Sequence, residues 1–171
     1  MTDQRTNLEA TDTPLFLAVQ MIARAGLAHG STMLEPSAGT GAIASVAKAT
    51  GVDVCMVELN AQRATDLHNR DLGPVWCGDF LSLQPGHFAL FGKPAPLSFD
   101  AVVMNPPINA HPHVTRAIQF VRPGGRLVAL LHRHIAQGFY DALGGEFEAL
   151  PDDTFVFKGK PIPAAIWSVT L

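Results

Sequence analysis

The sequence is poor in charge and has no cluster of basic residues. Only 16% of its 171 residues are charged, while 47% are hydrophobic, and this balance excludes an intrinsically disordered chain. The formal net charge is -3 and the isoelectric point is near 6.1. Lysine and arginine occur singly, so nothing predicts the basic face that a protein holding duplex DNA on its own would need. The length fits one domain with a sizeable core.

Cysteine and long apolar runs are also scarce. Cys55 and Cys77 each fall within a predicted strand without metal-ligand spacing, so we expect two reduced core residues. His132 and His134 flank a strand end without acidic or cysteine partners, and we therefore expect no metal site. Residues 1–12 lack the basic start and apolar run of a signal peptide, and no apolar stretch approaches about eighteen residues. We expect a cytoplasmic protein with no membrane partner.

What the sequence does contain is a glycine-rich stretch at residues 33–44. It begins apolar, reaches Glu35, passes Gly39 and Gly41, and continues as a run of small helix-forming residues. This order is typical of a strand, a ligand-binding loop and a helix, because glycine lets the backbone approach a ligand and a helix start presents unpaired N–H groups. With Ala44 the spacing is Gly-x-Gly-x-x-Ala, a degenerate dinucleotide-binding pattern. Plain turn glycines are the alternative.

Strands and helices are predicted to alternate along residues 13–171, after a flexible N-terminal segment of residues 1–12. Strands are expected from residue 33 and at 52–59, 75–77, 99–104 and 126–131, with a loop at 81–98. Helices are expected after a cap at Asp12 or Thr13, at 42–49, from a cap at Asn60 to residue 69, and at 114–121 and 132–143. Residues 154–157 and 165–170 should pair as an antiparallel hairpin. The fold class is therefore α/β, a single-domain, doubly wound, Rossmann-like and mostly parallel sheet with a C-terminal antiparallel hairpin.

Polar residues end four of the predicted strands, and in a doubly wound sheet ligands bind at this edge. They are Glu35, Glu58, Asp79 and Asn105. Glu58 lies about twenty residues after the glycine loop, where an acid can accept hydrogen bonds from both hydroxyls of a ribose. A carboxylate beside an aromatic ring, Asp79 next to Phe80, suits an adenine. The alternatives are a solvated loop acid and a helix cap before a core phenylalanine.

The sharpest signal is Asn105-Pro106-Pro107, directly after an apolar strand. Proline cannot continue a hydrogen-bonded strand, and two prolines stiffen the backbone while leaving Asn105 at the edge of the sheet. An ordinary Asn-Pro turn is the alternative. That alternative does not account for a position beside the glycine loop.

Taken in order, these motifs resemble the class I S-adenosylmethionine-dependent methyltransferases, and among them the group that methylates amino groups such as N6 of adenine. The resemblance covers nearly the whole chain. Its motifs are Leu34-Glu-Pro-Ser-Ala-Gly-Thr-Gly41, Glu58, Gly78-Asp-Phe80 and Asn105-Pro-Pro107, with Thr13-Pro14 upstream and Arg122-Pro-Gly-Gly-Arg-Leu127 before the fifth strand. It implies a Rossmann-like methyltransferase sheet with S-adenosyl-L-methionine as cofactor.

The resemblance also implies which residues hold the cofactor and the acceptor. The methionine end of the cofactor would lie against Thr13, Glu35 and the loop residues Pro36, Ser37, Ala38, Gly39 and Gly41. Glu58 would hold the ribose, Leu59 would pack on the adenine, and Asp79 with Phe80 would complete the adenine site. The catalytic motif would be Asn105, Pro106, Pro107 and Ile108. The Asn105 side chain and the Pro106 carbonyl would accept hydrogen bonds from the target amine and offset the charge that develops on it.

The chain departs from this family at Ile108, where an aromatic residue usually stacks on the target ring. His111 and His113 follow, and they either line the target pocket or are exposed turn residues. A segment that reads and extrudes a DNA base is not apparent. We therefore expect recognition by the 81–98 loop or by a protein partner, or a substrate other than duplex DNA.

The expected reaction is transfer of a methyl group from S-adenosylmethionine to an exocyclic amino nitrogen, with N6 of adenine in a DNA or RNA substrate as the leading acceptor. A protein glutamine amide and an amino group of guanine in ribosomal RNA are the alternatives within this class. A non-catalytic methyltransferase-like subunit and a nicotinamide-dependent dehydrogenase are the alternatives outside it.

Overall fold

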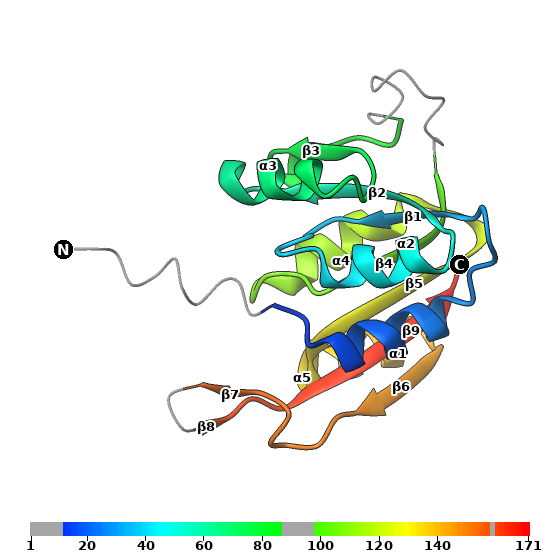
Figure 1. The fold of residues 1–171 in the computed structure, drawn as a ribbon. Helices are drawn as coiled ribbons and strands as arrows, with labels where there is room; N and C mark the ends of the chain where they lie inside the picture. The colour runs from blue at the N-terminus through cyan, green and yellow to red at the C-terminus, as the bar shows by residue number, and fades with distance from the viewer. Residues whose placement is uncertain (1–11, 87–97, 158–159) are drawn as a thin grey trace.

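The computed structural model describes residues 12–86, 98–157 and 160–171, and Figure 1 shows how helices and strands alternate along them. The helices are α1 (Leu15–Ala25), α2 (Ala42–Ala49), α3 (Ala61–Asn69), the short 3₁₀ helix η2 (Phe80–Ser82), α4 (Ala110–Ile118) and α5 (Arg133–Leu143). The strands are β1 (Thr32–Glu35), β2 (Asp53–Glu58), β3 (Val75–Cys77), β4 (Phe99–Met104), β5 (Val121–His132), β6 (Glu146–Ala149), β7 (Val156–Phe157), β8 (Lys160–Pro161) and β9 (Ala164–Thr170). The predicted N-terminal segment, apart from Asp12, and most of the predicted 81–98 loop lie outside the described residues.

The seven-stranded sheet has the order β3-β2-β1-β4-β5-β9-β6. Strands β1 to β5 run parallel, whereas β9 runs antiparallel to both of its neighbours, β5 and β6. The order reverses between β1 and β4, and this switch point is where doubly wound sheets bind ligands. The architecture confirms the predicted α/β fold, a mostly parallel Rossmann-like sheet with antiparallel strands near the C-terminus.

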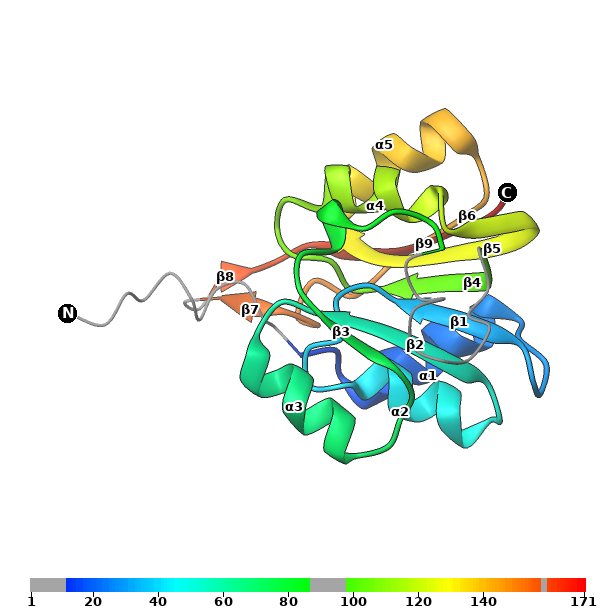
Figure 2. The ribbon, with the colours of Figure 1, turned by 90° about the horizontal axis from the view of Figure 1, so that it is seen from above.

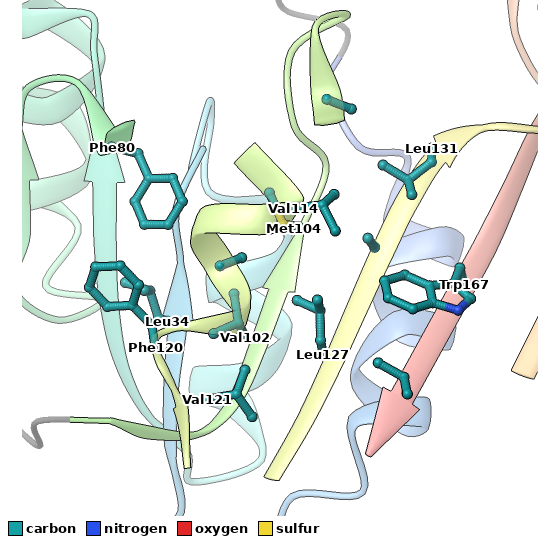
Figure 3. Packing of buried hydrophobic residues seen from close by; sticks show 14 of the residues in the cluster. Leu34, Phe80, Val102, Met104, Val114, Phe120, Val121, Leu127, Leu131 and Trp167 are labelled. Carbon is teal, nitrogen blue, oxygen red and sulfur yellow. The ribbon is translucent and has the colours of Figure 1, made fainter. Parts of the chain in front are cut away.

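Helices cover both faces of the sheet. Figure 2 shows α1, α2 and α3 on one face and α4 and α5 on the other. Side chains along each strand alternate between the two layers: on β4, Val103 belongs to the layer of α1, and Met104 belongs to the layer of α4. Figure 3 shows the second layer, in which Phe120 and Trp167 are fully buried. Nearly continuous apolar strands are typical of a sheet that is covered on both faces.

The predicted pairing of the C-terminal strands is wrong. Residues 154–157 do not pair with 165–170. Instead β7 pairs with β8, and β9 lies between β5 and β6. The reason is burial, because β9 is buried along nearly its whole length and needs a neighbouring strand on each side. Strand β6 has no counterpart in the prediction, since Glu146 and Glu148 give it the pattern of an exposed segment.

The boundaries predicted around β5 are also wrong. Helix α4 begins at Ala110 rather than residue 114, because Pro112 is tolerated in a first helical turn, where N–H groups have no helical partner. It ends at Ile118, and β5 already begins at Val121. Residues 122–125 are therefore an irregular part of β5, whose register with β4 shifts there, rather than a turn before the strand.

Two smaller predictions fail as well. Neither Asp12 nor Thr13 caps α1, whose N-cap is Pro14 with no side-chain hydrogen bond. Cys77 is exposed rather than part of the core, because it ends β3, a short strand at the edge of the sheet. Within the described ranges, no helix combines the length and the apolar character needed to cross a membrane.

Candidate functional site

A cavity of about 880 Å³ lies at the carboxyl ends of the parallel strands. Residues that follow β1, β2, β3 and β4 line it, together with the end of β5, the segment before α1 and the segments around the β7–β8 hairpin. The structure brings most of the predicted site residues together here: Thr13, Pro36, Ser37, Ala38, Gly39, Glu58, Leu59, Asp79, Phe80, Asn105, Pro106, Pro107 and Ile108. Glu35 and Gly41 are not among the lining residues.

The loop between β1 and α2 needs glycine at two positions. Gly39 and Gly41 have φ angles of 55° and 78°, in the left-handed region that other residues rarely adopt. The loop folds back on itself and on β2, because the Ala38 N–H donates to the Val57 carbonyl (2.9 Å) and the Gly41 N–H donates to the Ala38 carbonyl (2.7 Å). A Cβ at Gly41 would lie 2.5 Å from Leu67 Cδ2, so this glycine also permits close packing against α3.

Glu58 ends β2, and two backbone N–H groups hold its carboxylate. Its Oε2 accepts from the Gly39 N–H (2.7 Å) and its Oε1 from the Asn60 N–H (2.8 Å). The residue is only 7% exposed, yet it lines the cavity. Each carboxylate oxygen keeps a further lone pair, so a carboxylate held in this way can accept two more hydrogen bonds, as from a vicinal diol. Asn60 also caps α3 as predicted, since its side chain accepts from the Arg63 N–H (3.0 Å).

Glu35 ends β1 but is turned into the protein. It is 1% exposed, and its Oε2 accepts from the Ala44 N–H (2.8 Å) in the first turn of α2. Burial raises the pKa of this carboxyl well above its ordinary value, the Ala44 hydrogen bond opposes the rise, and the nearby charge of Glu58 adds to it. Glu35 therefore fixes the start of α2 behind the glycine loop.

Asp79 and Phe80 combine structural contacts with a position on the cavity. Asp79 caps η2, because its Oδ1 accepts from the Leu81 N–H (2.9 Å). Phe80 is 2% exposed, and its ring packs against Phe120 with centroids 5.3 Å apart. The helix cap and the core phenylalanine that the sequence left as alternatives are both present, and both residues also line the cavity.

Asn105 follows β4 at the edge of the sheet and contacts the segment before α1. Its Nδ2 donates to Thr13 Oγ1 at 3.2 Å, across 92 positions of the sequence. This bond orients the side-chain amide, with Nδ2 toward Thr13. Pro106 and Pro107 are half-buried, and Ile108 is 57% exposed at the rim.

The histidines divide between the cavity and the surface. His113 and His132 line the cavity, whereas His111 packs on Phe139 (5.0 Å between ring centroids) and His134 is exposed. His111 and His113 lie in α4 rather than in a turn. His113 lines the cavity, as one alternative predicted, and His111 is exposed, as the other predicted. Burial lowers the pKa of His113, and the nearby charge of Asp79 partly opposes this lowering. The Nδ1 atom of His113 is buried without a hydrogen-bond partner among the described residues. Across these residues, no group of three or more His, Cys, Asp or Glu side chains is arranged to hold a metal.

Sequence reasoning missed one side of the cavity. The lining residues on this side come from the end of β5 and from the β7–β8 hairpin with its flanking segments: Leu130, Leu131, His132, Phe155, Val156, Ile162 and Ala164. They meet because β9 enters the sheet antiparallel to β5, with His132 opposite Ala164. Only the apolar character of 164–169 hints at a buried strand, and no local motif indicates its partner. Elsewhere the prediction also lacked single lining residues beside the predicted ones: Thr40, Ala42, Asn60, Arg63, Gly78 and Ala110.

The strand order, the glycine loop after β1 and the acid that ends β2 together define a Rossmann-like methyltransferase fold. No protein-family model matches the sequence, and no curated protein matches it either. Solved structures do match along nearly the whole chain.

The chain is similar to the C-terminal domain of precorrin-6Y C5,15-methyltransferase from Rhodobacter capsulatus, with 16% identity and a TM-score of 0.67, over 98% of this chain and 96% of that one. It is similar to a protein of Pyrococcus horikoshii proposed to be an RNA methyltransferase, with 18% identity and a TM-score of 0.68, over 99% and 91% of the two chains. It is also similar to an RNA methyltransferase from Salinibacter ruber in complex with S-adenosyl-L-homocysteine, with 14% identity and a TM-score of 0.61, over 94% and 93%. At these identities the likeness establishes the fold, and the precorrin and RNA in these names show that one fold serves different acceptors.

Proposed function

We propose that this protein transfers a methyl group from S-adenosyl-L-methionine to an exocyclic amino nitrogen, with N6 of adenine in DNA or RNA as the acceptor. One observation carries the proposal. Asn105, held by Thr13 and followed by two prolines, lines the same cavity as Glu58, a buried acid that ends β2 and is fixed by the glycine loop.

The residues of one half of the cavity fit the cofactor. In this half, the Glu58 carboxylate has acceptor capacity for the two ribose hydroxyls, and Asp79 and Phe80 offer an acceptor and an apolar ring to an adenine. The N–H groups of Ala38, Gly39, Gly41 and Ala44 already donate within the protein. Thr40 and Ala42, which line the cavity at the start of α2, would therefore offer their N–H groups to the methionine carboxylate. A volume of about 880 Å³ lies near the top of the usual range for small-molecule pockets, so it leaves room for an acceptor group beside the cofactor.

The chain's own contribution to transfer comes from Asn105 and Pro106. The bound cofactor supplies a methyl group on a positively charged sulfur. The Asn105 Oδ1 and the Pro106 carbonyl accept hydrogen bonds from the target N–H groups, which orients the nitrogen and offsets the positive charge that develops on it. Thr13 orients the Asn105 amide for this role. The prolines keep the segment rigid, so the acceptor atoms stay in place.

The second candidate for the acceptor is an amino group of guanine in RNA, because it presents the same chemistry, an exocyclic amine on a flat ring. None of the described lining residues that follow β4 is lysine or arginine. Contacts to the phosphates of a polynucleotide would therefore come from outside the cavity, and we propose that a protein partner can supply them.

Methyl transfer is tested by incubating the chain with methyl-labelled S-adenosylmethionine and pools of DNA, RNA and protein. Mass spectrometry of the products then identifies the acceptor. Asn105→Ala should abolish transfer and leave cofactor affinity intact. Asn109→Ala is the matched control, because Asn109 lies four residues further along, is exposed and does not line the cavity. Full transfer activity in Asn105→Ala would contradict the mechanism. Label found on a glutamine amide of a protein would show that the acceptor is a protein amide rather than a nucleobase. Cofactor binding without transfer to any pool would indicate a non-catalytic subunit.

A further inference from the structure

The cavity ends, on the side away from Glu58, at an apolar wall. Phe155 precedes β7, Ile162 follows β8 and Ala164 begins β9, and all three line the cavity. Figures 1 and 2 both show the β7–β8 hairpin at the edge of the sheet where β5 ends and β9 begins. Since Met104 pairs with Ala129, β5 continues past the end of β4 and reaches this wall. The wall therefore lies on the β5 side of Asn105, which follows β4.

We call the part of the cavity that contains Asn105 and this wall the acceptor half, and define it as the lining residues 105–108, 130–132, 155, 156, 162 and 164. None of these residues is Lys, Arg, Asp or Glu. The charged residues among the described cavity lining lie outside this set. Glu58, Arg63 and Asp79 come from the ends of β2 and β3 and from α3, and Asp12 lies at the glycine loop, with its Oδ1 3.4 Å from the position of a Cβ at Gly39. An ionic group in the acceptor half would lose water without gaining a charged partner, whereas an uncharged ring loses little.

Phe155 is anchored from behind. Its side chain packs against the hydrophobic layer that contains α1, and it is half-buried. Its carbonyl accepts from the Ile162 N–H at 2.8 Å, which ties together the two strands of the wall. Phe155 is the one phenyl ring among the acceptor-half residues that the structure describes. An apolar ring with a fixed base is suited to hold a flat group by its face.

We propose that Phe155 is the aromatic platform of an acceptor subsite, and that Phe155, Ile162 and Ile108 select an uncharged flat ring that carries an exocyclic amine. This inference rests on the proposed function, which places the amine against Asn105. The ring can come from a free nucleobase or nucleoside or from a base extruded from a polynucleotide, since both present the same faces. Stacking of a base on an aromatic side chain contributes about a 5- to 150-fold gain in affinity.

The test is calorimetric titration of adenosine, and separately of a short single-stranded oligonucleotide containing adenine, into the chain saturated with S-adenosylhomocysteine. Phe155→Ala should weaken binding of the ring by about 5- to 150-fold, Phe155→Tyr should keep it, and Phe155→Leu should fall between them because it keeps volume without the ring. Affinity for S-adenosylhomocysteine should not change in any of the three. Binding of adenosine indicates a free ring, and binding of the oligonucleotide alone indicates a polymer.

Phe147→Ala is the matched control, because Phe147 is a partly buried phenylalanine on β6 that packs against Tyr140 and does not line the cavity. The inference is overturned if neither probe binds, or if Phe155→Ala binds as tightly as the unaltered chain. Methyl transfer to the same probes is measured in parallel with S-adenosylmethionine. Ring binding that depends on Phe155, without transfer by the unaltered chain, would contradict the proposed function and leave the subsite standing.

Discussion

The Glu58 carboxylate should be as important to the fold of the site as to the ligand, and Glu58→Gln isolates this role. Glutamine has the same shape but a single side-chain oxygen, so it can accept from the Gly39 N–H or from the Asn60 N–H but not from both. Because Glu58 is only 7% exposed, the backbone N–H group that loses its acceptor gains little from hydrogen bonding to water. A hydrogen bond to a charged group contributes about 1.5–3 kcal/mol, and we expect the free energy of unfolding to fall by about that amount.

Urea denaturation followed by circular dichroism measures this loss, which corresponds to a decrease of roughly 3–12 °C in Tm for a chain of this length. Asp53→Asn is the matched control, because Asp53 begins the same strand at its opposite end and is exposed. It should change stability by less than about 0.5 kcal/mol. Both variants are measured without ligand. If Glu58→Gln is then as stable as Asp53→Asn, the two backbone contacts of Glu58 do not hold the loop as described.

Three other predictions concern the loop, the buried acid and the thiols. Gly41→Ala should lower the free energy of unfolding by at least about 1 kcal/mol more than Gly30→Ala does. The two φ angles are nearly equal, 78° and 79°, but only a Cβ at Gly41 would meet a buried side chain, and equal losses in urea titration would refute this steric argument. Because the folded-state pKa of Glu35 is raised, the folded chain binds more protons there, and the stability that this group contributes below pH 4.5 is lost as pH rises through the folded pKa. Glu35→Gln should remove this loss, so from pH 4.5 upward the stability of the variant relative to the unaltered chain should increase. A difference in unfolding free energy that does not change with pH would contradict this prediction. A thiol reagent should modify the exposed Cys77 quickly and Cys55 slowly, because Cys55 is buried and its pKa is raised to about 11 by burial and by the charge of Asp53. A fast phase of modification that survives in Cys77→Ser would contradict this assignment.

The sequence predicts β1, β2 and the loops that follow them well, because the signals for these segments are local. The loop that contains Gly39 and Gly41, the acid at the end of β2 and the Asn60 cap all follow from spacing within one strand, loop and helix. Those residues lie where the pattern predicts.

Two features could not be read from local patterns. An acid at the end of a buried strand can face the ligand or the following helix, and only the structure shows that Glu35 bonds to the Ala44 N–H. The position of β9 between β5 and β6 depends on contacts between distant segments, so Phe155 and Ile162 reach the cavity without any signal in their own neighbourhood. For the same reason, the bond from Asn105 to Thr13 is visible only in the folded chain.

We propose that this cavity holds S-adenosylmethionine through Glu58. Calorimetric titration of S-adenosylhomocysteine into the full chain tests it most directly, with Glu58→Ala and Asp53→Ala measured beside it and NADH as a competing ligand. We predict saturable binding at one site, loss of binding in Glu58→Ala, unchanged binding in Asp53→Ala, and no displacement by NADH. Binding that survives in Glu58→Ala, or tight binding of NADH in place of S-adenosylhomocysteine, would contradict the claim.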